Sequence, residues 1–331
     1  MRVTVLGGGS WGTTVASVVS KHHDVVVWAR DPGVVAEINE QHANTGYLPG
    51  FTLHERLTAT NDLHDAVSRA ELLIVGVPSH AFRPTLEASR PSLRPWIPVV
   101  SLSKGLETGS LLRMTQVIKE VLPGRPAAAL TGPNLAREIT AGQAAAAVIA
   151  TEDLDVAAAL QAVLQSGLFR IYTNHDVIGC ELGGALKNVI AIATGMAQGL
   201  GVGDNTRATV ITRGLAELTR LGVAMGGEAA TFAGLTGMGD LVATCISPSS
   251  RNRQVGEQLG LGRCLPDILS QMNMVAEGVK TAVTVCELAA RHGVEMPVCH
   301  TIRRVIVGES TAAEAYDGLR HRSAGHEADP W

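Results

Sequence analysis

The chain has 331 residues, of which 18% are charged, and its formal net charge is −4. This length allows two domains of ordinary size, and the net charge excludes an overall field that would attract nucleic acid or an anionic membrane. The five cysteines are far apart and form no Cys-x-x-Cys pair, which argues against a zinc ribbon and a disulfide framework and indicates a reducing cytoplasm.

The first apolar stretch, Val3–Leu6, is too short for the core of a signal peptide, because it gives way to glycines after four residues. No other apolar run is expected to reach the length of a transmembrane span. We therefore expect a soluble, cytoplasmic protein without a membrane span, whose partner is a small molecule.

Short apolar runs alternate with helix-sized stretches up to about residue 175. Such runs are typical of buried parallel strands in a doubly wound sheet. The expected strands are 3–6, 24–29, 71–77, 97–103, 127–132, 145–150 and 170–173. From there to residue 315 the pattern indicates helices only. The predicted fold class is α/β, with an N-terminal Rossmann-type doubly wound parallel sheet (1–180), an all-helical C-terminal domain (181–315) and a disordered tail (316–331).

A glycine-rich turn follows the first strand and leads directly into a helix, with the spacing Gly7-x-Gly9-x-x-Gly12. In dinucleotide-binding folds, the first glycine permits a tight turn, the second lets the pyrophosphate approach the backbone, and the third lets helix and strand pack closely. Because strand and helix flank the motif correctly, it predicts a site for NADH or NADPH.

The end of the second strand bears on the choice between these cofactors, since an acidic residue there would bind the ribose of NADH. Trp28 or Ala29 occupies the expected position, and Arg30 then supplies a cation for the 2′-phosphate of NADPH. Asp31 would restore the acid if the alignment slipped by one residue, and Arg30 could be merely solvated. The sequence favours NADPH and leaves NADH open.

Two further strands end in polar or glycine-rich turns, at the edge of the sheet where ligands of such folds bind. The first turn carries Lys104, and the second carries Gly132, Asn134 and Ala136 before a helix. A lone lysine is usually a surface residue, but its place at a strand end makes Lys104 a candidate for ligand binding.

Lys187 lies within a long helical run of small and apolar residues, 180–198. On a helix it shares a face with Gly183, Gly184, Ile190, Ala191 and Thr194, so we expect a nearly flat surface against which a ligand can lie. A poorly solvated lysine can pass a proton at neutral pH. The alternative is a structural lysine paired with a buried acid.

Asp240 follows a glycine-rich turn, and Ser250, Arg251 and Asn252 come soon after it. Hydroxyl groups at a helix start, followed by arginine and asparagine, suit a phosphate or a carboxylate. An ordinary helix cap with solvated arginines is the alternative. The histidines are scattered, so we expect no metal site.

Six motifs resemble, in order, those of the bacterial NAD(P)-dependent sn-glycerol-3-phosphate dehydrogenase family: GGGSWGTTVA, SLSKGLE, TGPNLARE, GGALKNVIAIA, TGMGDLVATCISPSSRNR and VAEGVKTA. The resemblance covers roughly residues 1–310. It implies reversible reduction of dihydroxyacetone phosphate to sn-glycerol 3-phosphate in the cytoplasm, which feeds glycerophospholipid synthesis. It leaves the oligomeric state open, with a homodimer among the alternatives.

The resemblance also implies a role for each matched residue. Lys187 would accept the proton when glycerol 3-phosphate is oxidised. The cofactor-binding residues would be Gly7, Gly9, Ser10, Trp11, Gly12, Arg30, Lys104, Ala136, Arg251, Val275 and Glu277. The substrate-binding residues would be Lys104, Gly132, Asn134, Lys187, Asp240, Ser250, Arg251 and Asn252.

Two departures from known patterns bear on this interpretation. Asn134 stands where members of the family commonly have serine, so an amide replaces a hydroxyl contact. Ala191 stands where the related β-hydroxyacid dehydrogenases have an asparagine, four residues after the lysine, which argues against that family. A second hypothesis is a redox-sensing binder of NAD(P)H without catalysis, which would need neither Lys187 nor the anion site.

Overall fold

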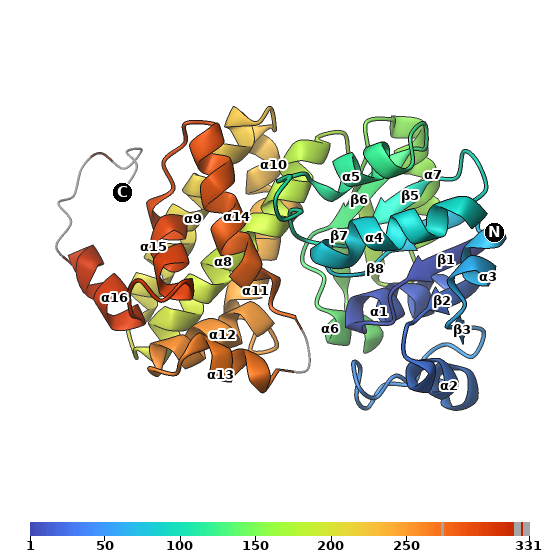
Figure 1. Cartoon of the computed structure of the whole chain (residues 1–331), viewed down its shortest axis with the longest axis horizontal. Helices are drawn as coiled ribbons and strands as arrows, with labels where there is room; N and C mark the ends of the chain where they lie inside the picture. The colour runs from blue at the N-terminus through green and yellow to red at the C-terminus, as the bar shows by residue number, and fades with distance from the viewer. Residues whose placement is uncertain (273–274, 321–325, 327–331) are drawn as a thin grey trace. The chain divides into compact units, whose positions relative to one another are not determined.

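The computed structural model describes residues 1–272, 275–320 and 326, and the chain divides into two compact units (Figure 1). Unit 1 comprises Met1–Glu107 and Leu112–Val177, and unit 2 comprises Thr108–Leu111 and the chain from Ile178 onward. The strands lie in unit 1, and the predicted domain boundary after residue 180 falls a few residues beyond its end.

Unit 1 contains an eight-stranded sheet in the order β3-β2-β1-β4-β5-β6-β7-β8. The strands are β1 (Arg2–Leu6), β2 (Asp24–Trp28), β3 (Thr58–Thr60), β4 (Leu72–Val75), β5 (Val99–Ser101), β6 (Ala127–Thr131), β7 (Ala145–Ala150) and β8 (Phe169–Asn174). Neighbouring strands are parallel except for β6 and β7, which pair antiparallel. The Rossmann-type sheet is therefore confirmed, with its last two strands reversed in direction.

Two features of this sheet differ from the sequence prediction. The pattern does not predict β3, because three residues are too few to give an apolar period. The reversal at β7 follows from a short connection, in which the five-residue α6 (Ala136–Thr140) does not carry the chain across the sheet. Buried apolar runs look alike in either strand direction, so the expectation of a wholly parallel sheet was wrong at this point.

Helices pack on both faces of the sheet, and each face has its own core. Val3 and Val5 belong to one core together with Leu160 of α7, and Leu6 belongs to the other together with Phe82 of α4. Besides α6, the helices of unit 1 are α1 (Ser10–Val19), α2 (Pro32–Gln41), α3 (Leu63–Ser68), α4 (Ser79–Ser89), the 3-10 turn η1 (Arg90–Ser92), α5 (Met114–Val121) and α7 (Leu154–Leu164). Burial on both faces fixes the sheet and gathers the carboxyl ends of its parallel strands at one edge.

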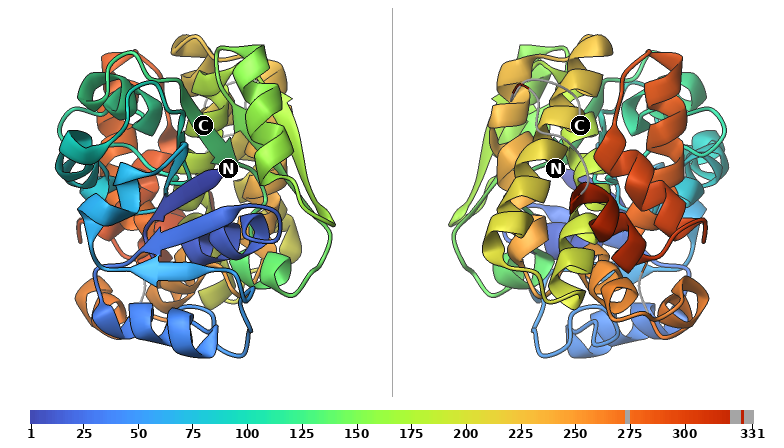
Figure 2. Two further views of the ribbon diagram at one scale, coloured as in Figure 1. Left: turned by 90° about the vertical axis from the view of Figure 1, so that its right-hand side faces the viewer. Right: turned by 90° about the vertical axis from the view of Figure 1, so that its left-hand side faces the viewer.

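In unit 2 the described residues form helices, as the sequence predicts (Figure 2). They are α8 (Val177–Gly199), α9 (Asp204–Ala224), α10 (Ala229–Ala233), the π-helical turn η2 (Leu235–Gly239), α11 (Asp240–Ile246), α12 (Arg251–Gly260), α13 (Leu265–Ser270), α14 (Glu277–Arg291), α15 (Pro297–Ile306) and α16 (Ala312–Arg320).

By length and composition alone α8 could cross a membrane, so the expectation that no apolar run is long enough was wrong. However, 89% of its most apolar window is buried inside the protein, as is typical of a core helix. Glycines let α12 approach it closely: a Cβ at Gly195 would lie 2.0 Å from the backbone oxygen of Arg253, and one at Gly256 would lie 2.0 Å from that of Ile192. The two helices are thereby held in one register.

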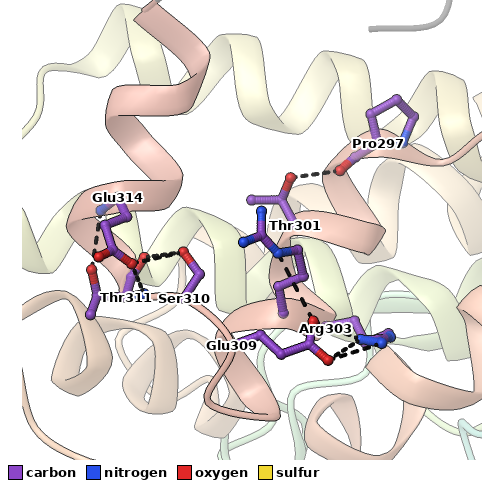
Figure 3. A network of polar contacts seen from close by, with 8 residues as sticks. Pro297, Thr301, Arg303, Glu309, Ser310, Thr311 and Glu314 are labelled. Carbon is purple, nitrogen blue, oxygen red and sulfur yellow. Dashed lines mark hydrogen bonds and ion pairs between the residues drawn. The ribbon is translucent and has the colours of Figure 1, made fainter.

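A capping box at the start of α16 overturns part of the predicted tail. The N–H of Thr311 donates to the Glu314 carboxylate at 2.8 Å, and the N–H of Glu314 donates to the Thr311 hydroxyl at 3.2 Å (Figure 3). Glu309, in the turn before, pairs with Arg303 and Arg304. Because Thr-x-x-Glu is a strong helix start, residues 316–320 are helical rather than disordered. The remainder of the predicted tail, 321–325 and 327–331, lies outside the described residues.

Candidate active site

The glycine-rich loop joins β1 to α1 as the fingerprint predicts. Gly7 has a φ of +118°, and a Cβ there would lie 2.9 Å from the backbone of Gly76. A Cβ at Gly12 would lie 2.2 Å from the oxygen of Gly7, whereas a Cβ at Gly9 would meet nothing within 4 Å. The outer glycines are therefore required by packing, and the middle one leaves its surface open. Since α1 has no side-chain cap, its first amides are suited to a phosphate.

The first turn of α1 carries two more of the predicted cofactor residues, Ser10 and Trp11. The Trp11 ring meets Phe169 edge-on, with 6.1 Å between ring centroids, and its Nε1 is buried without a partner among the described residues. Buried indole N–H groups usually have an acceptor, so this one fits a ligand atom. Ala136 lies close to α1, because its backbone oxygen accepts a bond of 3.4 Å from the Thr14 hydroxyl.

At the end of β2, Arg30 is exposed, whereas Asp31 is engaged in helix capping. The Asp31 carboxylate accepts a hydrogen bond of 2.8 Å from the N–H of Gly33 and so caps α2. Ala29 is buried, and a Cβ at Gly8 would lie 2.9 Å from its side chain. The one-residue slip that would give Asp31 to the ribose is therefore disfavoured, and Arg30 remains the candidate contact for a 2′-phosphate.

Lys104 and Gly132, predicted at two different strand ends, are in contact: Lys104 Nζ donates to the backbone oxygen of Gly132 at 2.7 Å. Asn134 has both side-chain polar atoms buried without a partner among the described residues, and so has the hydroxyl of Thr131. Each unsatisfied buried polar group costs about 1–3 kcal/mol. A polar ligand would remove this cost, so the cluster fits a hydroxylated or phosphorylated molecule.

Lys187 is 5% exposed in the middle of α8, and it forms an ion pair with Asp240, the first residue of α11. Its Nζ also donates to the Thr244 hydroxyl at 2.5 Å, and this hydroxyl donates to the backbone oxygen of Asp240 at 2.6 Å. With Asp240 only 1% exposed, the pair is shielded from water. Asp240 is therefore the buried acid that a structural lysine would require, and this ion pair does not exclude proton transfer by Lys187.

The helix face around Lys187 is covered by protein at Gly183 and Ala191, so the expectation of a flat surface along which a ligand lies was wrong. A Cβ at Gly183 would lie 2.6 Å from the backbone oxygen of Thr236, and Ala191 is completely buried. The small residues serve the packing of helices instead of a ligand. Burial also raises the pKa of Cys245, close to Lys187 and Asp240, to about 11, so its thiol stays neutral.

At the start of α12, Ser250 is the N-cap and its hydroxyl accepts from the N–H of Arg253 at 3.3 Å. The side-chain amide of Asn252 donates to Asn188 at 2.9 Å and accepts from the N–H of Gly278 at 3.0 Å. These bonds tie α12 and α14 to the residue beside Lys187. Ser250 and Asn252 therefore have structural roles, and contacts to a substrate remain a prediction for both.

Arg251, Val275 and Glu277, which the motifs predict as cofactor contacts, lie together in unit 2. Arg251 Nη1 donates to the backbone oxygen of Val275 at 2.8 Å. Burial lowers the pKa of the Arg251 guanidinium below its usual value, and the nearby charge of Glu277 opposes this effect. A partly buried guanidinium gains from an anionic partner, so Arg251 fits a phosphate or a carboxylate.

Comparison with protein families decides the identity. Residues 2–157 match the model of the NAD-dependent glycerol-3-phosphate dehydrogenase N-terminus, and residues 176–317 match that of the C-terminus. The chain belongs to the NAD-dependent glycerol-3-phosphate dehydrogenase family.

Individual glycerol-3-phosphate dehydrogenases are similar over the whole chain. The NAD(P)+ glycerol-3-phosphate dehydrogenase 2 of Sphingopyxis alaskensis is 59% identical over 100% of this chain and 99% of its own length. The enzyme of Mycobacterium avium is 51% identical over 98% and 96%, respectively. The crystal structure of glycerol-3-phosphate dehydrogenase from Coxiella burnetii has a TM-score of 0.93 at 34% identity and covers 97% of this chain and 99% of that chain.

Sequence reasoning missed three residues that lie beside the predicted site residues: Thr131 in unit 1, and Asn188 and Thr244 in unit 2. Thr244 lies one helical turn after Asp240, so the spacing of four residues could have indicated a shared face. Asn188 directly follows Lys187, but adjacent helical residues point in different directions, and only the fold shows that both are tied to the α11 and α12 region. Nothing in the sequence pattern marks Thr131.

Proposed function

We propose that this protein reversibly reduces dihydroxyacetone phosphate to sn-glycerol 3-phosphate with NADPH or NADH, and that it prefers NADPH. The observation that carries the proposal is the buried Lys187, held by Asp240 and Thr244 in a chain of the glycerol-3-phosphate dehydrogenase family. The reaction would take place in the cytoplasm, and its product would supply the backbone of glycerophospholipids.

Unit 1 offers the features that a dinucleotide requires. The open backbone at Gly9 and the uncapped start of α1 suit the pyrophosphate, and exposed Arg30 suits a 2′-phosphate. When bound, the reduced nicotinamide supplies a hydride for the ketone carbon. We assign further cofactor contacts to Ser10, Trp11, Lys104, Ala136, Arg251, Val275 and Glu277.

The hydrogen bonds around Lys187 support its role as the proton donor in reduction. An ammonium group has three N–H bonds, and among the described residues Asp240 and Thr244 accept two of them. Thr244 acts as an acceptor here, because its own proton goes to the Asp240 backbone. One N–H is left for the ketone oxygen, and in oxidation the neutral amine would take the alcohol proton. Asp240 stabilises the charged form of Lys187 between these steps.

The substrate contacts are assigned to two groups of residues. Arg251, with Ser250 and Asn252 at the start of α12, would hold the phosphate, since a guanidinium and helix-start donors suit a dianion. Lys104, Gly132 and Asn134 would hold the hydroxyl and carbonyl groups, because the Asn134 amide has no partner within the described chain. Asn134 would then make with its amide the substrate contact that serine makes with its hydroxyl in other members of the family.

The test is to follow the oxidation of NADPH and of NADH in parallel after adding dihydroxyacetone phosphate to the full-length protein. We expect steady oxidation with both cofactors and a higher kcat/KM with NADPH. Binding of NADPH without any oxidation above the substrate-free rate would contradict the proposal and favour the redox-sensing binder. Equal kcat/KM values would contradict the cofactor preference alone.

A further inference from the structure

The amino-terminal edge of the sheet in unit 1 carries an exposed aromatic side chain. Trp96, just before β5, is 76% exposed, the highest value among the exposed large apolar side chains of the described residues. Its φ is +65°, a left-handed conformation that costs a bulky residue roughly 1–2 kcal/mol. The indole ring lies next to Gly124, since a Cβ at Gly124 would lie 3.5 Å from its Cζ3 atom. Trp96 is therefore presented to the outside by a strained but ordered loop.

Arginines lie near this tryptophan. Arg125 donates to the backbone oxygen of Arg94 at 3.1 Å, on the chain segment that leads to Trp96. The pKa of Arg125 is lowered by burial and by the charge of Arg90, so two guanidinium groups repel each other here. Arg90 and Arg94 are exposed, and within the described chain neither side chain has an ion-pair partner.

Two acidic residues lie near these cations: Glu71, and the exposed Asp24, which pairs in register with Arg2. The pKa of Glu71 is lowered, first by a hydrogen bond of 2.8 Å from the backbone N–H of Arg2 and then by the charges of the N-terminal ammonium, Arg94 and Arg2. The four cations Arg2, Arg90, Arg94 and Arg125 outnumber the carboxylates of Glu71 and Asp24, which leaves a local positive excess although the whole chain has a net charge of −4. We call Arg2, Arg90, Arg94, Trp96 and Arg125 the basic edge.

We propose that the basic edge docks reversibly on an anionic lipid surface, with Trp96 at the level of the headgroups and the arginines against the lipid phosphates. Tryptophan beside arginine is the combination that suits a membrane interface, because the indole has an apolar body and a polar tip and the guanidinium binds phosphate with two N–H bonds. Each basic residue near such a surface contributes attraction that salt screens. Because a single tryptophan and a few arginines anchor weakly, the association is peripheral.

The position of the basic edge leaves the cofactor residues accessible. It lies beside the amino ends of β1, β4, β5 and β6, whereas Gly9, Lys104 and Gly132 follow the carboxyl ends of β1, β5 and β6. In a parallel sheet, the amino ends of the strands lie on one side and the carboxyl ends on the opposite side. A lipid surface at one edge therefore does not cover the other, and docking is independent of the proposed reaction.

The experiment is co-sedimentation of the full-length protein with vesicles of phosphatidylcholine, with or without phosphatidylglycerol, at low and high ionic strength. We expect binding only to vesicles that contain phosphatidylglycerol, and loss of binding at high salt. Arg94→Gln should lower the partition coefficient about fivefold, since one basic residue near an anionic surface contributes that order of attraction. Arg291→Gln, which removes an exposed arginine of unit 2, is the matched control and should have no effect.

Trp96→Gly removes the indole without destabilising the fold, because glycine adopts the left-handed conformation of this position without strain. A loss of binding in this variant can therefore not be attributed to unfolding. We expect a melting temperature equal to or above that of the parent protein and binding reduced at least about fivefold, since a tryptophan is a main interfacial anchor. Leu261→Ala, at a 62% exposed side chain of unit 2, is the control. Unchanged binding of Trp96→Gly, or equal binding to vesicles without phosphatidylglycerol, would overturn the proposal. Tighter binding to a single-stranded oligonucleotide, or Trp96-dependent self-association without vesicle binding, would assign the edge to another partner.

Discussion

Replacing Lys187 by methionine tests what the buried ion pair contributes to the protein. Methionine keeps an unbranched apolar stem but removes the positive charge that pairs with Asp240, which is 1% exposed. Removing one partner of a buried pair typically costs about 3–5 kcal/mol. We expect the free energy of unfolding of Lys187→Met to fall by about this amount, because the buried carboxylate loses the positive charge that Lys187 supplies.

The double variant Lys187→Met/Asp240→Leu separates stability from catalysis. Neither charge remains buried in it, and an apolar replacement of a buried pair is often neutral or stabilising by about 1–4 kcal/mol. We expect the free energy of unfolding to return to within about 2 kcal/mol of the parent value. Turnover of dihydroxyacetone phosphate should nevertheless stay lower by a factor of about 10² or more, the usual contribution of a general acid.

Two measurements on the same samples decide the matter. Urea unfolding followed by circular dichroism gives the stability, and NADPH oxidation with dihydroxyacetone phosphate gives the turnover, with NADPH affinity as the control for an intact unit 1. A double variant that regains both stability and turnover would show that Lys187 is only structural. A Lys187→Met variant as stable as the parent would refute the argument from the buried pair.

Four further predictions concern other residues. Arg30→Ala should raise the Kd of NADPH more than that of NADH, because only NADPH carries the 2′-phosphate; titration with both cofactors checks this, and equal losses would contradict it. Asn134→Ala should raise the KM for dihydroxyacetone phosphate without lowering the melting temperature, since its buried amide is unsatisfied without a ligand; a destabilised variant with normal KM would oppose it. Arg251→Ala should raise the activation free energy that corresponds to kcat/KM by about 2–4 kcal/mol, and phosphite should no longer rescue the reaction of free dihydroxyacetone. Preserved rescue would show that the phosphate binds elsewhere. Glu217 accepts from the N–H groups of Val298 and Cys299, and burial raises its pKa above the ordinary value of 4.5, so the folded protein binds this proton more tightly than the unfolded chain does. In urea unfolding, the stability of the parent relative to Glu217→Gln should therefore fall as the pH rises above 4.5, and an increase in relative stability would contradict this.

The parts of the fold that the sequence predicts are those governed by local patterns. Apolar runs mark seven strands of the sheet, and the spacing of Gly7, Gly9 and Gly12 predicts which backbones are crowded and which is open. The direction of β7 depends on how its neighbours pack, which no local pattern records. The start of α16 at Thr311 was within reach, because its capping box is a local signal that the tail prediction ignored.

At the candidate site, the sequence selects residue types but not their partners. The sequence leaves open whether Lys187 is paired with a buried acid and whether Asp31 could bind a ribose. The three-dimensional structure answers both questions: Lys187 pairs with Asp240, and the Asp31 carboxylate accepts from the N–H of Gly33. The expectation of a flat face on α8 fails because small residues suit a ligand and a neighbouring helix equally well. Packing at Gly183 shows that a neighbouring segment covers this face of α8.

The most direct test of the central claim is to identify the product formed from dihydroxyacetone phosphate and NADPH, by phosphorus NMR combined with an assay specific for the sn-glycerol 3-phosphate enantiomer. We predict sn-glycerol 3-phosphate in equimolar ratio to the NADPH oxidised, and none with Lys187→Met. Oxidation of NADPH without this product, or with both enantiomers in equal amounts, would contradict the claim that the protein holds the ketone in one orientation and delivers its proton from Lys187.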